Sequence, residues 1–219
     1  MALPEVTLQR RLGSHATVAL AQQQELALVS TVSAAKRKVT DLLQASASLH
    51  SSPPDMKPAV EELVVENPTA KAGEATLSGR FEGTWEVFSA PHIASLGAAC
   101  GARFEPIRYR LEGDRLVSNV RFSSSLAQEG WLSASGRLKP AISNDVVEVA
   151  FDKFWVDFGS NSLRPSLGSE GALDRVVGAL GRAGFFSHFA VFPVLYLDDD
   201  MAVFRFPPLN SNIAVRRVA

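Results

Sequence analysis

Residues with obvious chemical reactivity are few in this sequence and widely spaced. The single cysteine is Cys100, and a lone cysteine is far more often a small buried hydrophobic residue than a nucleophile. The sequence contains no nucleophile elbow, phosphate-binding glycine loop or dinucleotide-binding fingerprint. The histidines lack metal-ligand spacing and are His15, His50, His92 and His188. We therefore expect no catalytic residues, metal site or cofactor, and a protein that is not an enzyme.

The most conspicuous acids are three consecutive aspartates, Asp198 to Asp200. As a general acid/base pair or a cation site they would need convergent partners, which the sequence does not show. Their simpler interpretation is a tight, solvated turn between two strands. We expect the turn, because an enzyme acting on lipid would rest on these three residues alone.

A second group of residues suits binding better than catalysis. Aromatic residues occur on the inward faces of several expected strands, together with small or hydroxyl-bearing residues that leave room beside them. A solid barrel core would give the same periodicity and remains the alternative. Tyr109 and Tyr196 could orient a ligand through their hydroxyls or bond the backbone. The candidate ligand-binding residues are Trp85, Tyr109, Phe122, Phe151, Tyr196 and Phe204, and the small inward residues are Gly83, Ser118, Ala134 and Gly136.

Two regimes of hydrophobic periodicity indicate the elements that would position these residues. Residues 16–66 are rich in helix-forming residues, and a second short helix ends before Pro68. From Leu77 onward the period is two, with a hairpin turn at residues 112–114 and a β-bulge near residues 152–153, where the apolar face switches. A loop with a glycine-interrupted helix is expected over residues 168–186, before three final strands.

About eight short strands result, and an antiparallel meander of this length can hide its edges by closing into a barrel. An eight-stranded barrel is wide enough to hold one small ligand. The expected fold is therefore mainly β with N-terminal helices, built around an antiparallel eight-stranded β-barrel.

The two ends of the barrel segment are expected to meet. The first strand carries Gly83 and Trp85 on its apolar side, and the last strand carries Arg216 and Arg217 on opposite faces. In a closed barrel these strands pair, so one arginine could stack on the Trp85 ring, whereas solvated charges are the simpler alternative. We expect these four residues to close the barrel.

The overall composition excludes some classes of protein. The 219 residues carry a formal net charge of -1, which gives no reason to expect nucleic-acid binding. One cysteine allows no intrachain disulfide and fits a reducing compartment. Residues 1–35 contain basic and hydroxyl residues with few acids, which is compatible with an organelle transit peptide or with an ordinary N-terminal helix. No apolar stretch is long enough to predict a membrane span.

Several of these features together resemble a known family. Gly83-Thr84-Trp85 with an arginine on the closing strand is similar to lipocalin-type barrels. The longer pattern resembles the plastid lipid-associated proteins, also called fibrillins or plastoglobulins, over about residues 38–218. Its ordered features are a leucine-rich helix, a second helix ending in Asn67-Pro68, the Gly83/Trp85 strand, Asn119 after a hairpin, and a turn at Leu197-Asp198-Asp199-Asp200. The sequence departs from the family pattern at Ala202, where a basic residue is usual.

The resemblance implies a fibrillin-type domain over residues 36–219: a lipocalin-like β-barrel at 77–219 with a helical brace at 36–66 packed against it. It favours a plastid transit peptide at residues 1–35. It also implies a non-catalytic chloroplast protein of thylakoids or plastoglobules that binds prenylquinones, carotenoids or fatty-acid derivatives. The alternative is a structural coat or scaffold of lipid globules that contacts a prenyl-lipid enzyme and needs no internal ligand.

Overall fold

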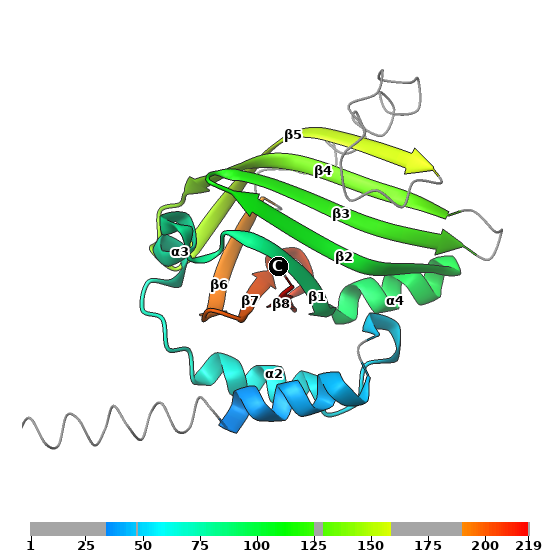
Figure 1. Cartoon of the computed structure of the whole chain (residues 1–219), viewed down its shortest axis with the longest axis horizontal. Helices are drawn as coiled ribbons and strands as arrows, with labels where there is room; N and C mark the ends of the chain where they lie inside the picture. Colours follow the sequence, from blue (N-terminus) through cyan, green and yellow to red (C-terminus); the bar gives the residue numbers. More distant parts are fainter. Residues whose placement is uncertain (1–33, 47, 125–128, 159–189, 219) are drawn as a thin grey trace, which may run out of the picture.

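Eight antiparallel strands follow one another around a closed barrel, and the last strand, β8, pairs with the first, β1 (Figure 1). The computed structural model describes residues 34–46, 48–124, 129–158 and 190–218. The strands are β1 (Gly83–Ser89), β2 (Ala102–Glu112), β3 (Arg115–Ser124), β4 (Glu129–Pro140), β5 (Val146–Phe158), β6 (Val191–Leu197), β7 (Met201–Phe206) and β8 (Ser211–Arg217). The expected eight-stranded antiparallel barrel with accompanying helices is confirmed.

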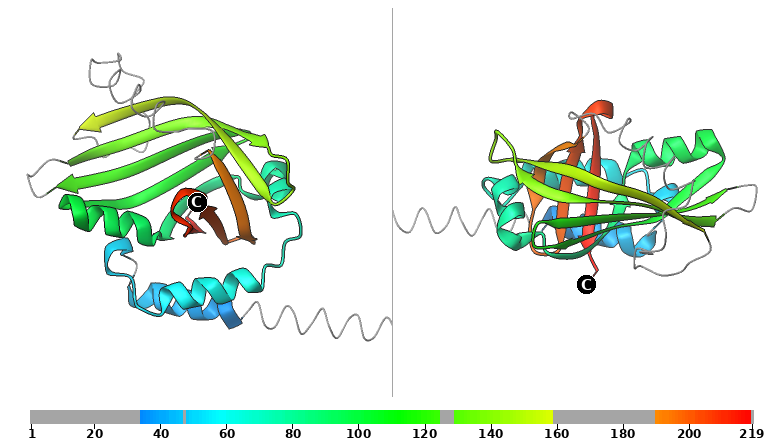
Figure 2. Two further views of the ribbon diagram at one scale, coloured as in Figure 1. Left: turned by 180° about the vertical axis from the view of Figure 1, so that it is seen from behind. Right: turned by 90° about the horizontal axis from the view of Figure 1, so that it is seen from above.

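The strands differ in length, which gives the barrel two unlike halves. β2 to β5 contain 10 to 13 residues each, whereas β1, β6, β7 and β8 contain 6 or 7. β5 pairs with β6 through residues 146–148, so its C-terminal part extends beyond the paired region. Figures 1 and 2 show the long strands as a broad, curved sheet opposite the short ones.

Two helices pack against the outer face of the short strands (Figure 1). The described part of the first covers residues 34–45, and the second, α2, spans Met56–Val65, with a short turn at Leu49–Ser51 between them. The buried residues of α2 recur every three or four positions and so lie on one face. The helices and the barrel wall share one apolar cluster, formed by Ala35, Val39, Leu43, Met56, Ala59, Val60, Leu63, Phe88, Tyr196, Met201, Val203 and Ala214. The helices therefore form a brace outside the barrel.

The chain between α2 and β1 is helical and bent, which moves the start of the barrel. Helix α3 (Ala72–Ala75) continues into a helical turn over Thr76–Arg80. The sequence predicts a strand from residue 77, but pairing begins only at Gly83, so that boundary is wrong. The reason is the backbone of Gly79 and Gly83, whose positive φ values of 98° and 107° turn the chain twice before the strand.

One helix of the barrel was not expected from the sequence. Helix α4 (Pro91–Cys100) connects β1 to β2, with proline in its first turn and Gly101 ending it in the left-handed conformation. Only Gly97 of this helix is buried and Leu96 is 54% exposed, so its larger apolar residues do not form a buried face.

The expected β-bulge occurs in β5. Ser135 pairs with Lys153 and Gly136 pairs with Phe151, which leaves Asp152 as the extra residue. A Cβ added to Gly136 would lie 2.6 Å from the carbonyl oxygen of Ala150. Gly136 is therefore required by the close approach of β5, and it does not make room for a ligand as its small size suggests.

Candidate ligand-binding interior

Arg217 and Trp85 close one end of the barrel. They are Cα partners on β8 and β1, and the Arg217 guanidinium carbon lies 4.4 Å from the centroid of the Trp85 ring, a cation–π distance. The guanidinium also donates hydrogen bonds to the backbone carbonyls of Arg80 (2.8 Å), Asp199 (2.6 Å) and Glu82. One side chain thus ties the last strand to the entry of β1 and to the β6–β7 turn. The prediction that an arginine stacks on Trp85 is confirmed for Arg217.

Trp85 is fully buried, and its surroundings explain the neighbouring glycine. Its Nε1 donates a hydrogen bond to the carbonyl oxygen of Phe81 at 2.9 Å, and the two rings stack with centroids 4.4 Å apart. Gly83 lies between them in a conformation that favours glycine, so the chain bends and Phe81 folds back onto Trp85. These contacts make this end of the barrel a solid floor.

Arg216 contributes to the same closure from the outer face. Its Nη2 donates a hydrogen bond to Glu86 Oε1 at 3.1 Å, and Arg108 Nε donates to Glu86 Oε2 at 2.9 Å. Glu86 on β1 therefore bridges β8 on one side and β2 on the other. The two arginines of β8 thus act on opposite faces of the barrel wall, as the alternation predicts.

The inward face of the long strands becomes more accessible with distance from this floor. The register places Tyr109, Ser118 and Ala134 in one row with Trp85, and all three keep part of their surface accessible. One level further from the floor, inward-facing Leu132 is 41% exposed. The level nearest the floor is buried and is lined by Leu111, Leu116, Gly136 and Leu138.

The outward-facing neighbours of Leu132 on β4 are more buried than Leu132 itself. Trp131 and Ser133 flank Leu132 on β4, yet they are only 7% and 3% exposed. A solid barrel core would bury its inward side chains first. At this level the inner face of β4 instead has accessible apolar surface, where the long strands extend beyond the pairing of β5 with β6.

Tyr109 is the polar group that stands out on this wall. Its hydroxyl has no hydrogen-bond partner among the described residues, and the same is true of Ser118, its Cα partner on β3. Burial raises the pKa of Tyr109 to about 12, so the phenol stays protonated at neutral pH. Two hydroxyl donors therefore lie at one level of an otherwise apolar wall.

The structure brings most of the other candidate residues to the same interior. Phe204 of β7 belongs to the interior cluster, where its ring meets Phe81 edge-on at 5.1 Å. Phe151 packs against that cluster and lies 5.6 Å from the ring of Phe154. Phe122 pairs with Gly130 on the same face, toward the accessible end.

Tyr196 is the exception, because it lies outside the barrel. It is fully buried in the cluster shared by the wall and the brace, away from Trp85 and Tyr109. The expectation that it faces inward is wrong for a local reason: the register of β6 shifts between Val194 and Tyr196, which turns the tyrosine to the other face.

The Tyr196 hydroxyl joins a polar network that holds the brace. It donates a hydrogen bond of 2.5 Å to Asp198 Oδ2, and Lys36 Nζ lies 2.9 Å from that oxygen and 2.7 Å from Asp200 Oδ2. Burial opposes ionisation of Asp198, but the bonds from Tyr196, Lys36 and the amides of Asp200 and Met201 outweigh it and keep its pKa below the usual value. The triple aspartate is thus a turn, as expected, and it anchors the first helix.

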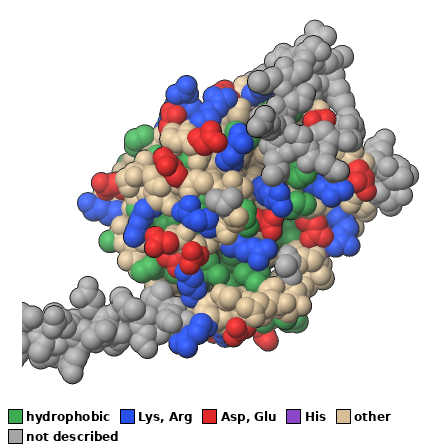
Figure 3. Space-filling view, in the orientation of Figure 1, with side chains coloured by type: hydrophobic (Ala, Val, Ile, Leu, Met, Phe, Trp, Pro, Cys, Tyr) green, Lys and Arg blue, Asp and Glu red, His purple; other side chains and the backbone are tan. Residues whose placement is uncertain are grey.

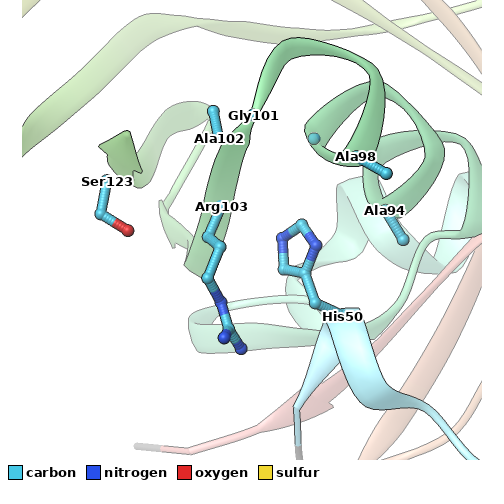
Figure 4. A pocket seen from close by; sticks show the side chains of 8 residues that line it. His50, Ala94, Ala98, Gly101, Ala102, Arg103 and Ser123 are labelled. Carbon is cyan, nitrogen blue, oxygen red and sulfur yellow. The ribbon is translucent and has the colours of Figure 1, made fainter. Parts of the chain in front are cut away.

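A hollow lies outside the barrel wall, between α4, the 49–51 turn and the start of β2 (Figure 4). It has a volume of about 490 Å³ and is lined mostly by small residues, three of which (Ala94, Gly97 and Ala98) belong to α4. His50 Nε2 accepts a hydrogen bond from the Phe104 amide at 2.9 Å, and Arg103 pairs with Glu105. These polar groups serve the packing of the turn against β2, so the hollow has no evident recognition element.

The histidines and acids of the described ranges do not assemble a metal site. No group of three or more His, Cys, Asp or Glu residues there could hold a metal ion. His92 stacks on Phe206, and burial lowers its pKa. Figure 3 shows basic and acidic side chains interspersed over the described part of one face. His15, His188 and the helix expected at residues 168–186 lie outside the described residues.

Comparison with models of known protein families finds no match to this chain, and no curated protein matches its sequence. Within the described ranges, none of the helices combines the length and apolar character needed to cross a membrane. What the chain itself provides is a closed antiparallel barrel with a solid floor and an accessible apolar inner wall.

Proposed function

We propose that the protein is a non-catalytic binding protein that holds a hydrophobic small molecule or lipid inside its barrel. The observation that carries this proposal is the contrast on β4, where inward Leu132 is 41% exposed and its outward neighbours Trp131 and Ser133 are buried. Water on an apolar inner wall is displaced favourably by an apolar ligand. The proposed lining is Tyr109, Phe122, Phe151 and Phe204, with Trp85 as the floor.

The resemblance to plastid lipid-associated proteins adds a proposed setting. In this proposal the protein works in plastids, at thylakoids or lipid globules, and its ligands are prenylquinones, carotenoids or fatty-acid derivatives. The Gly83/Trp85 strand and the Arg217 contact support the lipocalin-like part of this resemblance. Expression of residues 1–35 fused to a fluorescent protein in plant cells tests the location, and cytosolic fluorescence would contradict it.

Binding can be tested with the apolar fluorophore N-phenyl-1-naphthylamine. We expect a saturable rise in its emission on addition of wild-type protein. Ala134 faces the interior beside Ser118, so Ala134→Trp fills the proposed site and should weaken binding by at least about 10-fold. The milder Ala134→Leu provides a second variant in case tryptophan unfolds the barrel.

Lys139→Trp is the matched control, because Lys139 lies on the exposed outer face of the same strand. It should bind the fluorophore as wild type does. Absence of binding to wild type would contradict the proposal. Equal binding by folded Ala134→Trp, Ala134→Leu and Lys139→Trp would also contradict it and would support the alternative of a surface coat or scaffold for lipid globules.

A further inference from the structure

Tyr109 presents a hydroxyl group that forms no hydrogen bond with another described residue. Tyr109 is half-buried, and its hydroxyl is not among the buried side-chain atoms that lack a partner in the described ranges, so the hydroxyl reaches accessible space. The hydroxyl of Ser118 beside it has no partner among the described residues either. A ligand in the interior can therefore reach this hydroxyl and accept its hydrogen bond in place of water.

The charge of the interior limits what that partner is. Among the described strand residues that face inward, Arg217 is the one with a charged side chain, and its guanidinium is already bound to three carbonyls at the floor. An ionised carboxylate at Tyr109 would thus be buried without a compensating cation, which is costly. A neutral oxygen acceptor avoids this cost and suits a phenol that stays protonated.

We propose that Tyr109 donates a hydrogen bond to a carbonyl oxygen of the ligand, so that the barrel selects apolar molecules carrying a ketone, quinone or ester group over plain hydrocarbons. This inference rests on the proposed function and deepens it. Ser118 supplies a second hydroxyl at the same level of the wall. The apolar body of the ligand then extends from Tyr109 along Val120, Leu132 and Val156, toward the accessible end.

Displacement of bound N-phenyl-1-naphthylamine by 2-tridecanone and by tridecane tests this selectivity, because the two competitors have the same chain length and differ in one carbonyl. Wild type should prefer the ketone. Tyr109→Phe removes only the hydroxyl. It should weaken the affinity for the ketone by about 3- to 10-fold and leave the affinity for tridecane unchanged. Tyr196→Phe makes the same chemical change outside the barrel and should keep the wild-type ratio of affinities.

Thermal unfolding separates a ligand contact from a structural role. Because the Tyr109 hydroxyl has no partner among the described residues, Tyr109→Phe should not lower Tm in the absence of ligand. Tyr196→Phe should lower Tm through loss of the bond to Asp198. An unchanged ketone-to-alkane ratio in Tyr109→Phe, or a clear loss of Tm, would overturn the inference while leaving the binding function intact. Failure of wild type to bind the fluorophore would overturn both.

Discussion

The guanidinium of Arg217 lies 4.4 Å from the centroid of the Trp85 ring, and this contact joins the last strand of the barrel to the first. Its hydrogen bonds to the carbonyls of Arg80, Glu82 and Asp199 bring the β6–β7 turn into the same closure. The floor of the barrel therefore depends on the side chain of Arg217, the last residue of β8.

Removal of the Arg217 side chain should weaken the fold markedly. Arg217→Ala loses the cation–π contact and leaves three carbonyls without their donor, for which we expect a loss of about 2–4 kcal/mol in the free energy of unfolding by urea. Arg216→Ala is the control, since its partly exposed pair with Glu86 should contribute only about 0–1 kcal/mol. Equal losses in the two variants would show that Arg217 does not close the barrel.

The bulge in β5 should make Gly136 intolerant of a side chain. An alanine Cβ there would lie 2.6 Å from the carbonyl oxygen of Ala150, so Gly136→Ala should lower the free energy of unfolding by about 1–3 kcal/mol or more. Gly113 in the β2–β3 turn has a positive φ but nothing within 4 Å, so Gly113→Ala should cost about 1 kcal/mol. Urea titration of both variants checks this order, and a reversed order would contradict the bulge.

The helical brace should be an integral part of the fold. Leu63 of α2 is fully buried against the barrel wall, and Leu63→Ala should lower the free energy of unfolding by about 2–5 kcal/mol. Val65, two residues later in the same helix, is 86% exposed, so Val65→Ala should change the free energy of unfolding by no more than about 0.5 kcal/mol. If Leu63→Ala unfolds with wild-type stability, the brace is not docked as described.

Stability at acidic pH should depend on Asp198. Its pKa is held below the 3.8 of an unperturbed aspartate, so it stabilises the folded state above that pH and this contribution fades as pH falls through the lower folded-state pKa. The free energy of unfolding should therefore decrease more steeply between about pH 5 and pH 2 in wild type than in Asp198→Asn. Asp199→Asn should keep the wild-type slope, because the Asp199 side chain has no ion pair among the described residues. Parallel slopes in all three proteins would contradict the network with Lys36.

Much of the barrel could be predicted because inward and outward residues alternate along its strands. The switch of the apolar face near residues 152–153 identified the bulge, and the meeting of the first and last strands placed an arginine on Trp85. Helix α4 was not predicted; it connects β1 to β2, and only Gly97 of it is buried. The start of β1 was misplaced because Leu77 and Phe81 continue the alternation through a segment that two glycines bend.

The site was harder to predict, because alternation does not tell one buried face from another. Both faces of β6 are buried, one in the barrel interior and the other against the brace. The sequence pattern therefore does not show that Tyr196 faces the helices. No sequence pattern indicates which side chains lie near the Tyr109 hydroxyl. The structure shows this through the register, which places Ser118 and Ala134 beside Tyr109 without a hydrogen bond to its hydroxyl.

The most direct test of an internal ligand is methyl NMR of the protein, labelled at Leu and Val, during titration with N-phenyl-1-naphthylamine. The account predicts that the inward methyl groups of Val120, Leu132 and Val156 shift and show contacts to the ring protons of the fluorophore. Changes confined to surface methyl groups such as those of Leu96 and Leu209, with the inward ones unmoved, would contradict it.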